Sequence, residues 1–339
     1  MSKALFHLLA YLQGRGSIIR NTKYLLKTQS MPTKDIEILQ FEKLRKIVSY
    51  AYAKVPYYKM KFDEAGFSPE KFRNIEDIEK IPILTKEDIQ KNTERFISVD
   101  FRKDDLLKNS TGGSTGYPLI FYHSRQYQNW ATADIHRHFT WCGHQVGERF
   151  ALLWGSDYDY NRVNKLRRDI ENYIKNWLWI NTFNIREAEF AEHIVRLKQF
   201  RPVFLIGYAS SLHMLARILK KNSEKIESID AVESSAELLY PRQRKDIESI
   251  LNCRVFDRYG CREVGNIAHE CKEHKGLHIS SENNFVEFLD KYGQSVGYGK
   301  EGRVVVTNLN NFAFPFIRYD VGDIGSPLGK ECSCGINFL

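Results

Sequence analysis

Apolar residues recur with two different spacings along this chain of 339 residues. Up to about residue 100 they return every three or four positions, as in the series Ile38, Phe41, Leu44, Ile47, Val48 and Ala51. This period predicts a helix over 35–61 that Pro56 ends or kinks. Thr85 precedes Lys86-Glu87-Asp88 and is placed as the N-cap of another helix. We therefore expect residues 1–105 to form a helical N-terminal region.

The middle of the chain alternates short apolar runs with helical patterns. Strands are predicted at 119–122, 150–155, 202–208, from 231, and at 255–260. Helices are predicted at 126–141, 187–200, 211–221 and 241–251. Strands that alternate with helices favour a largely parallel sheet whose faces are covered. We expect an α/β core over residues 106–275.

The pattern changes again after about residue 275. Short strands are predicted at 285–289, 303–307 and 316–319, with hairpin turns at 291–293 and 300–302. This part should be a β-rich subdomain over residues 276–339. The fold class is α/β, with a helical beginning, mixed but mostly parallel sheets and a β-rich end.

Residues 109–118 form a loop rich in glycine and hydroxyl groups, with the sequence Asn-Ser-Thr-Gly-Gly-Ser-Thr-Gly-Tyr-Pro. Glycines and small hydroxyls let an anionic ligand, such as a chain of phosphates, approach the backbone N–H groups. A flexible surface turn has the same composition, so this stretch alone leaves both interpretations open. The loop is not the phosphate loop of nucleoside triphosphatases, because it lacks Gly-Lys-Ser/Thr and precedes a strand.

Charge and composition narrow the classes of partner. The chain carries 50 Lys and Arg against 42 Asp and Glu, but the basic residues are scattered. We predict no nucleic-acid partner, and we interpret the aromatic and basic stretch 156–180 as a partly buried helix. The basic excess fits a phosphate-rich ligand or an anionic membrane surface.

Cysteines and hydrophobic runs bear on the location of the protein. The six cysteines do not form the pattern of a disulfide framework. No stretch reaches the roughly 18 to 20 apolar residues of a spanning helix, and we read no signal peptide. A cytoplasmic protein is predicted. The amphipathic residues 1–30 either dock onto the domain or contact a membrane surface.

Four stretches occur in an order that matches a known pattern. They are Ser110-Thr111-Gly112-Gly113-Ser114-Thr115-Gly116-Tyr117-Pro118, Ser235-Ala236-Glu237, Asp257-Arg258-Tyr259-Gly260-Cys261-Arg262-Glu263 and Arg318-Tyr319-Asp320-Val321-Gly322-Asp323. Together they resemble the adenylate-forming enzymes, the superfamily of acyl- and aryl-CoA ligases. Residues 81–86 and 268–278 resemble its phenylacetate–CoA ligase branch and the capsular-polysaccharide-biosynthesis relatives of that branch. The resemblance implies the fold of the large N-terminal domain of these enzymes.

The resemblance also implies roles for individual residues. The β- and γ-phosphates of ATP would be held by Ser110, Thr111, Gly112, Gly113, Ser114, Thr115 and Gly116. The adenosine would meet Ser235, Ala236, Glu237, Tyr259, Gly260 and, through the ribose hydroxyls, Asp323. Catalysis would involve Glu263 as the Mg²⁺ ligand, Thr115 and Arg262. Taken singly, Tyr259 could be a core aromatic residue, Glu263 a surface charge and Asp323 a turn former.

The chain departs from the pattern at three points. Tyr117 replaces a lysine that many relatives carry, and Arg262 stands where they have serine or threonine. A small C-terminal lid domain with a catalytic lysine is expected to be absent. Two functions therefore remain. One is ATP- and Mg²⁺-dependent activation of a small carboxylic acid, followed by transfer to CoA. The other is a catalytically impaired nucleotide-binding or scaffold protein of a polysaccharide assembly system.

A group of cysteines and histidines forms a possible structural zinc site. The candidates are Cys271, His274, His278, Cys332 and Cys334. Three thiolates and one imidazole would give a closed tetrahedral site, whereas free cysteines and solvated histidines are the alternative. His278 is preferred over His274, because the run Gly-Leu-His is the part that resembles the family.

Overall fold

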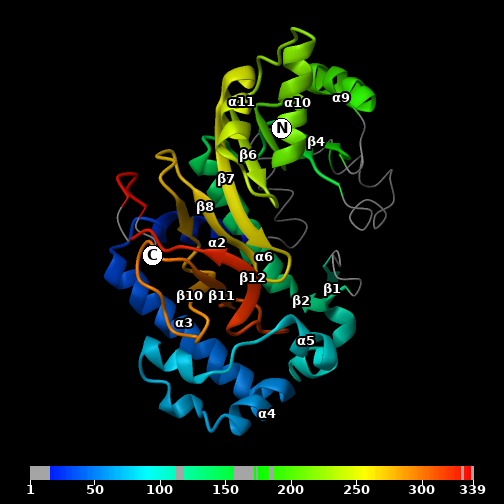
Figure 1. Cartoon of the computed structure of the whole chain (residues 1–339). Coiled ribbons are helices and arrows are strands. Elements are labelled where there is room, and N and C mark those ends of the chain that lie inside the picture. Colours follow the sequence, from blue (N-terminus) through cyan, green and yellow to red (C-terminus); the bar gives the residue numbers. More distant parts are fainter. Residues whose placement is uncertain are drawn as a thin grey trace. The chain divides into compact units, whose positions relative to one another are not determined.

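The structure is a computed structural model and describes residues 16–111, 118–155, 172, 175–182, 187–329 and 332–336. The chain divides into two units, drawn with their elements in Figure 1. The first comprises residues 1–19, 135–259 and 269–277, and the second 20–134, 260–268 and 278–339. We describe each unit by itself. The division of the sequence at residues 105 and 275 stays a prediction.

A parallel sheet forms the centre of the first unit. Its strands are β3 (Phe150–Leu153), β4 (Trp177–Ile180), β5 (Phe204–Tyr208), β6 (Ala231–Ser235) and β7 (Arg254–Cys261). They are parallel and follow the order β4-β3-β5-β6-β7, which continues into β8 (Gly265–Glu270) and β9 (Leu277–Ile279). This arrangement confirms the predicted mostly parallel sheet.

Apolar side chains cover both faces of the sheet, because neighbouring residues of a strand point to opposite sides. Leu205 belongs to a core shared with α9 (Glu187–Phe200), α10 (Ala209–Lys221) and α11 (Pro241–Leu251). Its neighbours Phe204 and Ile206 belong to a second core with Phe139 of α6 (Arg125–Trp141). Burial on both sides explains why these strands read as continuous apolar runs.

The second unit combines helices with antiparallel sheets. Its helices are α2 (Gly16–Thr28), α3 (Thr33–Lys54), α4 (Pro56–Glu64) and α5 (Lys86–Asn92), with short 3₁₀ turns at Pro69–Lys71, Ile75–Lys80, Thr93–Phe96 and Lys103–Asp105. One sheet pairs β1 (Leu107–Ser110) with β2 (Ile120–His123). The other has the order β10 (Asn284–Leu289), β11 (Gly302–Asn308) and β12 (Tyr319–Gly325).

Two local predictions in the helical region are confirmed. Pro56 ends α3 and is the first residue of α4, where its missing N–H costs nothing. Thr85 accepts a hydrogen bond from the N–H of Asp88, and the Asp88 carboxylate accepts one from the N–H of Thr85. This reciprocal capping box fixes the start of α5.

Two predictions were wrong in detail. The strand expected at 316–319 is β12 at 319–325, because the preceding apolar residues form a buried loop that Arg318 closes at a φ of 51°. Within the stretch 156–180, the structure has strand β4 at 177–180, which pairs with β3.

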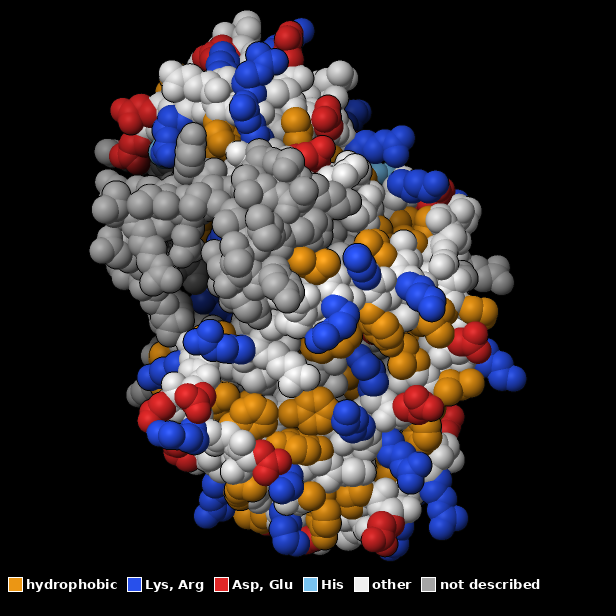
Figure 2. All heavy atoms as spheres, turned by 180° about the vertical axis from the view of Figure 1, so that it is seen from behind, with side chains coloured by type: hydrophobic (Ala, Val, Ile, Leu, Met, Phe, Trp, Pro, Cys, Tyr) orange, Lys and Arg blue, Asp and Glu red, His pale blue; other side chains and the backbone are white. Residues whose placement is uncertain are grey.

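The surface carries mixed charge. On the face drawn in Figure 2, Lys and Arg side chains are interspersed with acidic and apolar ones. This pattern agrees with the scattered basic residues of the sequence. Among the described residues, no helix is long and apolar enough to span a membrane.

A buried ion pair anchors the loop that leads into β12. The Arg318 guanidinium, whose residue is 3% exposed, contacts both carboxylate oxygens of Glu287 on β10, at 3.1 and 2.8 Å. It also donates to the backbone oxygens of Glu79 and Ile81. The arginine therefore joins the sheet to the segment that precedes α5.

Replacing Arg318 with methionine should lower the free energy of unfolding by about 3–5 kcal/mol, because Glu287 would lose its counter-charge while it stays buried. Urea denaturation followed by tryptophan fluorescence measures this loss. The control is Arg303→Met, which breaks the more exposed pair with Asp320 and should cost less than about 1 kcal/mol. Equal losses in the two variants would contradict the prediction.

Candidate functional site

The glycine-rich loop is closed at its base by two hydrogen bonds between its flanks. The N–H of Thr111 donates to the carbonyl oxygen of Leu119, at 3.1 Å. The N–H of Leu119 donates to the Thr111 hydroxyl, also at 3.1 Å. The loop thus joins β1 to the antiparallel β2, which confirms a strand–loop–strand arrangement. The predicted phosphate ligands Gly112, Gly113, Ser114, Thr115 and Gly116 lie outside the described residues.

Residues 262 and 263 are brought to this base from a distant part of the chain. Nη1 of Arg262 donates to the backbone oxygen of Ser110, at 3.5 Å. Glu263 is buried, and the Tyr319 hydroxyl donates to its Oε1 at 2.9 Å. Its backbone oxygen lies 3.0 Å from Nε2 of His123. The base of the loop, a guanidinium and a buried carboxylate therefore lie together in the second unit.

The charge on Glu263 affects its hydrogen-bond donor. Burial first, and then the negative charge of Glu263, raise the pKa of Tyr319 well above its ordinary value. The Tyr319 hydroxyl therefore stays protonated and donates a hydrogen bond to the carboxylate. A carboxylate has about four lone-pair positions, so Tyr319 leaves capacity on Glu263 for a metal ion. The donor set fits Mg²⁺, which prefers carboxylate and phosphate oxygens.

Gly260 has a packing reason to be glycine. A Cβ atom built on it would lie 2.4 Å from the backbone oxygen of Gly265, which belongs to β8. A side chain is therefore excluded by the close approach of the two strands, whether or not a ligand binds. Gly260 positions the turn that carries Arg262 and Glu263.

Asp323 lies on β12, and its side chain is exposed. On the same strand, Asp320 accepts a hydrogen bond from Nη1 of Arg303, at 2.9 Å. The exposure of Asp323 leaves it accessible to a ligand in solution.

The remaining predicted residues belong to the first unit, at the carboxyl ends of its parallel strands. Ser235 ends β6, and its hydroxyl accepts a hydrogen bond from Nε of Arg258 on the adjacent β7, at 3.1 Å. Tyr259 follows Arg258 on that strand. Ligands of open parallel sheets bind at this edge, so the two segments occupy a suitable place.

Glu237 has a structural role, and Ala236 has an unusual backbone conformation. The Glu237 carboxylate accepts hydrogen bonds from the N–H and the hydroxyl of Ser210, at 2.8 and 3.0 Å. Ser210 lies in the first turn of α10, where N–H groups lack partners within the helix. Ala236 has a φ of 65°, in the left-handed region that costs a residue with a Cβ atom about 1–2 kcal/mol.

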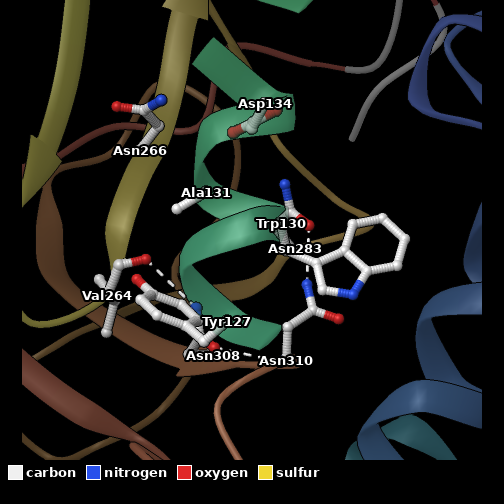
Figure 3. Close-up of a pocket in the computed structure, with 9 residues that line it drawn as sticks. All are labelled: Tyr127, Trp130, Ala131, Asp134, Val264, Asn266, Asn283, Asn308 and Asn310. Carbon is white, nitrogen blue, oxygen red and sulfur yellow. Dashed lines mark hydrogen bonds between the residues drawn. The ribbon is translucent and has the colours of Figure 1, made fainter. Parts of the chain in front are cut away.

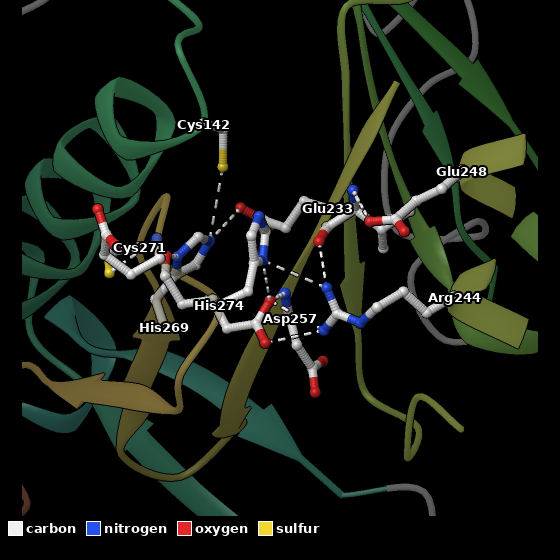
Figure 4. A network of polar contacts seen from close by, with 11 residues as sticks. Cys142, Glu233, Arg244, Glu248, Asp257, His269, Cys271 and His274 are labelled. Carbon is white, nitrogen blue, oxygen red and sulfur yellow. Dashed lines mark hydrogen bonds and ion pairs between the residues drawn. The ribbon is translucent and has the colours of Figure 1, made fainter. Parts of the chain in front are cut away.

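A buried polar network, drawn in Figure 4, lies behind this edge. Glu233 of β6 is fully buried, lies 3.1 Å from Nε of Arg258, and pairs with Nε2 of His269 at 3.0 Å. Nδ1 of His269 lies 2.6 Å from the backbone oxygen of Glu270. Burial alone would raise the pKa of Glu233, but Arg258 and His269 outweigh it and hold that pKa below its ordinary value.

Asp257 and Glu270 form the second half of the network. Arg244 contacts both carboxylate oxygens of Glu270, at 2.8 and 2.9 Å, and the N–H of Asp257 donates to Glu270 at 2.9 Å. His274 also lies 3.1 Å from Glu270. Burial, and then the charge of Glu270, raise the pKa of the Asp257 carboxyl to about 6.

A small polar pocket in the second unit lies beside the segment that follows Glu263. Figure 3 shows its lining, which comes from α6, β8 and three asparagines. The hydroxyl of Tyr127 and the side-chain nitrogens of Asn266 and Asn283 are buried and have no hydrogen-bond partner among the described residues.

Part of the predicted cysteine and histidine group lies within the second unit. His278, Cys332 and Cys334 belong to the second unit, and their ligand atoms lie within 4.8 Å of one another. Sγ of Cys334 lies 3.4 Å from Nε2 of His278. Cys271 belongs to the first unit, as does His274, which contacts Glu270.

Known proteins resemble the chain over most of its length. A phenylacetate-coenzyme A ligase of Thermus thermophilus is 25% identical over 92% of this chain and 70% of its own length. Protein CapK of Staphylococcus aureus is 26% identical over 85% of this chain and 62% of its own. A phenylacetate-coenzyme A ligase of Escherichia coli is 24% identical over 91% of this chain and 70% of its own. No family model matches the chain.

Solved structures show the same fold. A 2-hydroxyisobutyryl-CoA ligase in an open conformation superposes with a TM-score of 0.78 at 19% identity, over 92% of this chain and 74% of that protein. Its structure holds 2-HIB-AMP and CoA. The fold of the chain is thus that of the adenylate-forming enzymes. Its sequence is similar to those of phenylacetate-coenzyme A ligases.

Two contact residues of the candidate site were missed at the level of sequence. Tyr319 binds the Glu263 side chain and His123 binds its backbone. Tyr319 belongs to a matched motif, but nothing in that motif indicates which group its hydroxyl contacts. His123 directly follows the strand predicted at 119–122. This position next to the glycine-rich loop was the one feature of the sequence that indicated a contact with the candidate site.

The raised pKa of Asp257 predicts a pH effect on stability. Between about pH 4 and pH 6 the folded protein holds a proton on this carboxyl that the unfolded chain has lost, so this group makes stability fall as pH rises. Asp257→Asn should therefore stabilise the protein at pH 7 by about 2 kcal/mol, and by less towards pH 4. Urea denaturation at both pH values measures the difference.

Asp246→Asn is the matched control for this prediction. His213 lowers the pKa of Asp246, so the control should give no gain in stability at pH 7. Equal gains in the two variants would refute the assignment to Asp257.

Proposed function

We propose that this protein activates a small carboxylic acid with ATP, as an acyl- or aryl-adenylate, and transfers it to CoA. The observation that carries the proposal is the meeting of Ser110, Arg262 and Glu263 at the base of the glycine-rich loop. The chain spans 62 to 70% of the length of the relatives named above. The names of the two phenylacetate-coenzyme A ligases support ligase chemistry.

The second unit supplies the groups for the phosphates. Thr111 accepts from Leu119, so its hydroxyl hydrogen can be donated to a phosphate oxygen. Arg262 brings a positive charge to the same place, although a guanidinium is bulkier than the serine or threonine of relatives. In our proposal Gly112, Gly113, Ser114, Thr115 and Gly116 complete the contacts, and Thr115 and Arg262 assist catalysis.

Glu263 is the proposed Mg²⁺ ligand. Bound Mg²⁺ would offset charge on the phosphate oxygens as pyrophosphate leaves. The Tyr319 hydroxyl holds one carboxylate oxygen of Glu263, which limits rotation of the side chain. A carboxylate that is already oriented binds a cation with little reorganisation.

The adenosine contacts are proposed for both units. In the first, the edge formed by Ser235, Ala236 and Tyr259 would meet adenine, and Glu237 would act by holding that segment to α10. In the second, Gly260 would shape the turn, and Asp323 would accept hydrogen bonds from the ribose hydroxyls.

A role in surface polysaccharide biosynthesis is the finer part of the proposal, and the similarity to CapK supports it. The alternative is a nucleotide-binding or scaffold protein of a polysaccharide assembly system that no longer catalyses. Arg262 favours that alternative, because its guanidinium is engaged with Ser110. Exchange between ATP and pyrophosphate distinguishes the two functions.

With Mg-ATP and a panel of aryl and acyl carboxylic acids, we expect acid-dependent exchange of pyrophosphate into ATP. Glu263→Gln should lower the exchange rate at least about 100-fold, because it removes the charge that binds the cation in the transition state. Glu224→Gln, which changes an exposed glutamate paired with Lys198, should leave the rate unchanged.

Two results would contradict different parts of this prediction. ATP binding without exchange for any acid would support the non-catalytic alternative. If Glu263→Gln exchanged pyrophosphate at the wild-type rate, Glu263 would have no part in the mechanism. The proposed function itself would not be affected.

We also propose a structural zinc ion bound by His278, Cys332 and Cys334, with Cys271 as the fourth ligand expected from the sequence. The proximity of the first three ligand atoms supports this proposal. Three thiolates and one imidazole match a closed tetrahedral zinc site.

Protein purified without chelator should contain about one zinc per chain, as is usual for a closed four-ligand site. Elemental analysis should show that Cys334→Ser loses the zinc and that the control Cys253→Ser retains it. Cys253 is a partly buried cysteine outside the group. Wild-type protein free of zinc would refute the site.

A further inference from the structure

A histidine outside the matched motifs connects three elements of the second unit. His123 ends β2 and is 3% exposed. Its Nδ1 lies 3.2 Å from the side-chain nitrogen of Asn109 on β1 and 3.0 Å from that of Gln128 on α6. Its Nε2 lies 3.0 Å from the backbone oxygen of Glu263. Both nitrogens of the ring are therefore engaged.

These partners determine which nitrogen carries the hydrogen. A carboxamide nitrogen only donates, so Nδ1 of His123 must be the acceptor of Asn109 and Gln128. A backbone oxygen only accepts, so Nε2 carries the hydrogen and donates it to Glu263. Because Nδ1 accepts and only Nε2 carries a hydrogen, the ring is neutral in this arrangement.

The residues that follow Glu263 are held from the same side. The Asn308 side chain donates to the backbone oxygen of Val264, at 3.2 Å. Tyr127, whose ring centroid lies 4.2 Å from that of His123, is close enough to Gly265 that a Cβ there would lie 2.8 Å from its hydroxyl. The backbone is thus held by hydrogen bonds at residues 263 and 264, and Tyr127 packs closely against Gly265.

His123 also reaches the base of the glycine-rich loop. Asn109 directly precedes Ser110, whose backbone oxygen accepts from Arg262. One side of the ring therefore contacts the strand that carries the loop, and the other contacts the backbone of the proposed cation ligand. A shift of the ring would move both.

We propose that His123 is a positioning residue, which fixes the Glu263 backbone relative to the base of the loop and so sets the affinity for the Mg²⁺ that accompanies ATP. This inference rests on the proposed function, in which Glu263 binds that cation. His123 contacts neither nucleotide nor metal in this scheme and acts only through Glu263.

The test compares His123→Phe with His123→Gln in the full chain. Phenylalanine keeps an aromatic ring and removes all three hydrogen bonds, whereas the glutamine amide can donate to the Glu263 backbone. ATP is titrated calorimetrically at a series of Mg²⁺ concentrations, and pyrophosphate exchange is followed over the same series. His123→Phe should raise the Mg²⁺ concentration at half-saturation about tenfold, the effect of losing one buried hydrogen bond.

Two further features distinguish positioning from general loss of structure. ATP affinity without Mg²⁺ should change less than about twofold in His123→Phe, and His123→Gln should recover most of the Mg²⁺ response. The matched control is His213→Phe, which removes a histidine that pairs with Asp246 and should leave the Mg²⁺ response unchanged. If His123→Phe does not fold, Asn109→Ala and Gln128→Ala each remove one donor to Nδ1 and should raise the half-saturation about two- to threefold.

The possible outcomes separate this inference from the proposed function. If ATP binding by the His123, Asn109 and Gln128 variants depended on Mg²⁺ as in the wild type, the role of His123 would be refuted. The proposed function would still stand. Equal weakening of ATP binding with and without Mg²⁺ would also overturn it, because the role would then be structural. Wild-type protein whose ATP affinity does not respond to Mg²⁺ would overturn the proposed function and the inference with it.

Discussion

The carboxylate of Glu263 is the group on which the second unit's candidate site depends. A buried carboxylate is costly unless donors replace its hydration. Here the Tyr319 hydroxyl contacts the side chain, while His123 contacts the backbone of the same residue. The two donors come from β12 and β2, so the site needs both antiparallel sheets of the unit in place. A bound cation would balance the negative charge of the carboxylate, which the neutral Tyr319 hydroxyl does not.

The orientation of Tyr319 depends in turn on a part of the fold with no chemistry of its own. The residue before it, Arg318, pairs with Glu287 and binds the backbone at Glu79 and Ile81. Leu84 then bridges to Tyr319, and Thr85 caps α5 directly afterwards. The N-terminal helical segment therefore helps to fix where β12 begins. This is why the helical beginning of the chain contributes to the candidate site.

Structural features that depend on the spacing of neighbouring residues could be predicted from the sequence. Helices α9 and α11 begin and end at the predicted residues, and the break at Pro56 was correct. The start of β12 was missed, because the apolar residues before it are buried in a loop and carry no strand pairing. The contacts of His123 with Glu263 join residues 140 positions apart, and no periodicity contains that information. Ordered motifs indicated which residues matter, and only the fold showed what supports them.

The acidic residues of the two units differ in how much of their capacity to bind a ligand remains unoccupied. In the first unit, Glu237 holds the first turn of α10, Glu233 pairs with Arg258 and His269, and Glu270 pairs with Arg244. Each carboxylate is occupied by donors of its own chain, so a nucleotide at that edge would be recognised through backbone groups and the Tyr259 ring. In the second unit, one hydroxyl on Glu263 leaves room for a cation. The two units therefore differ in the contacts that each could offer to a ligand.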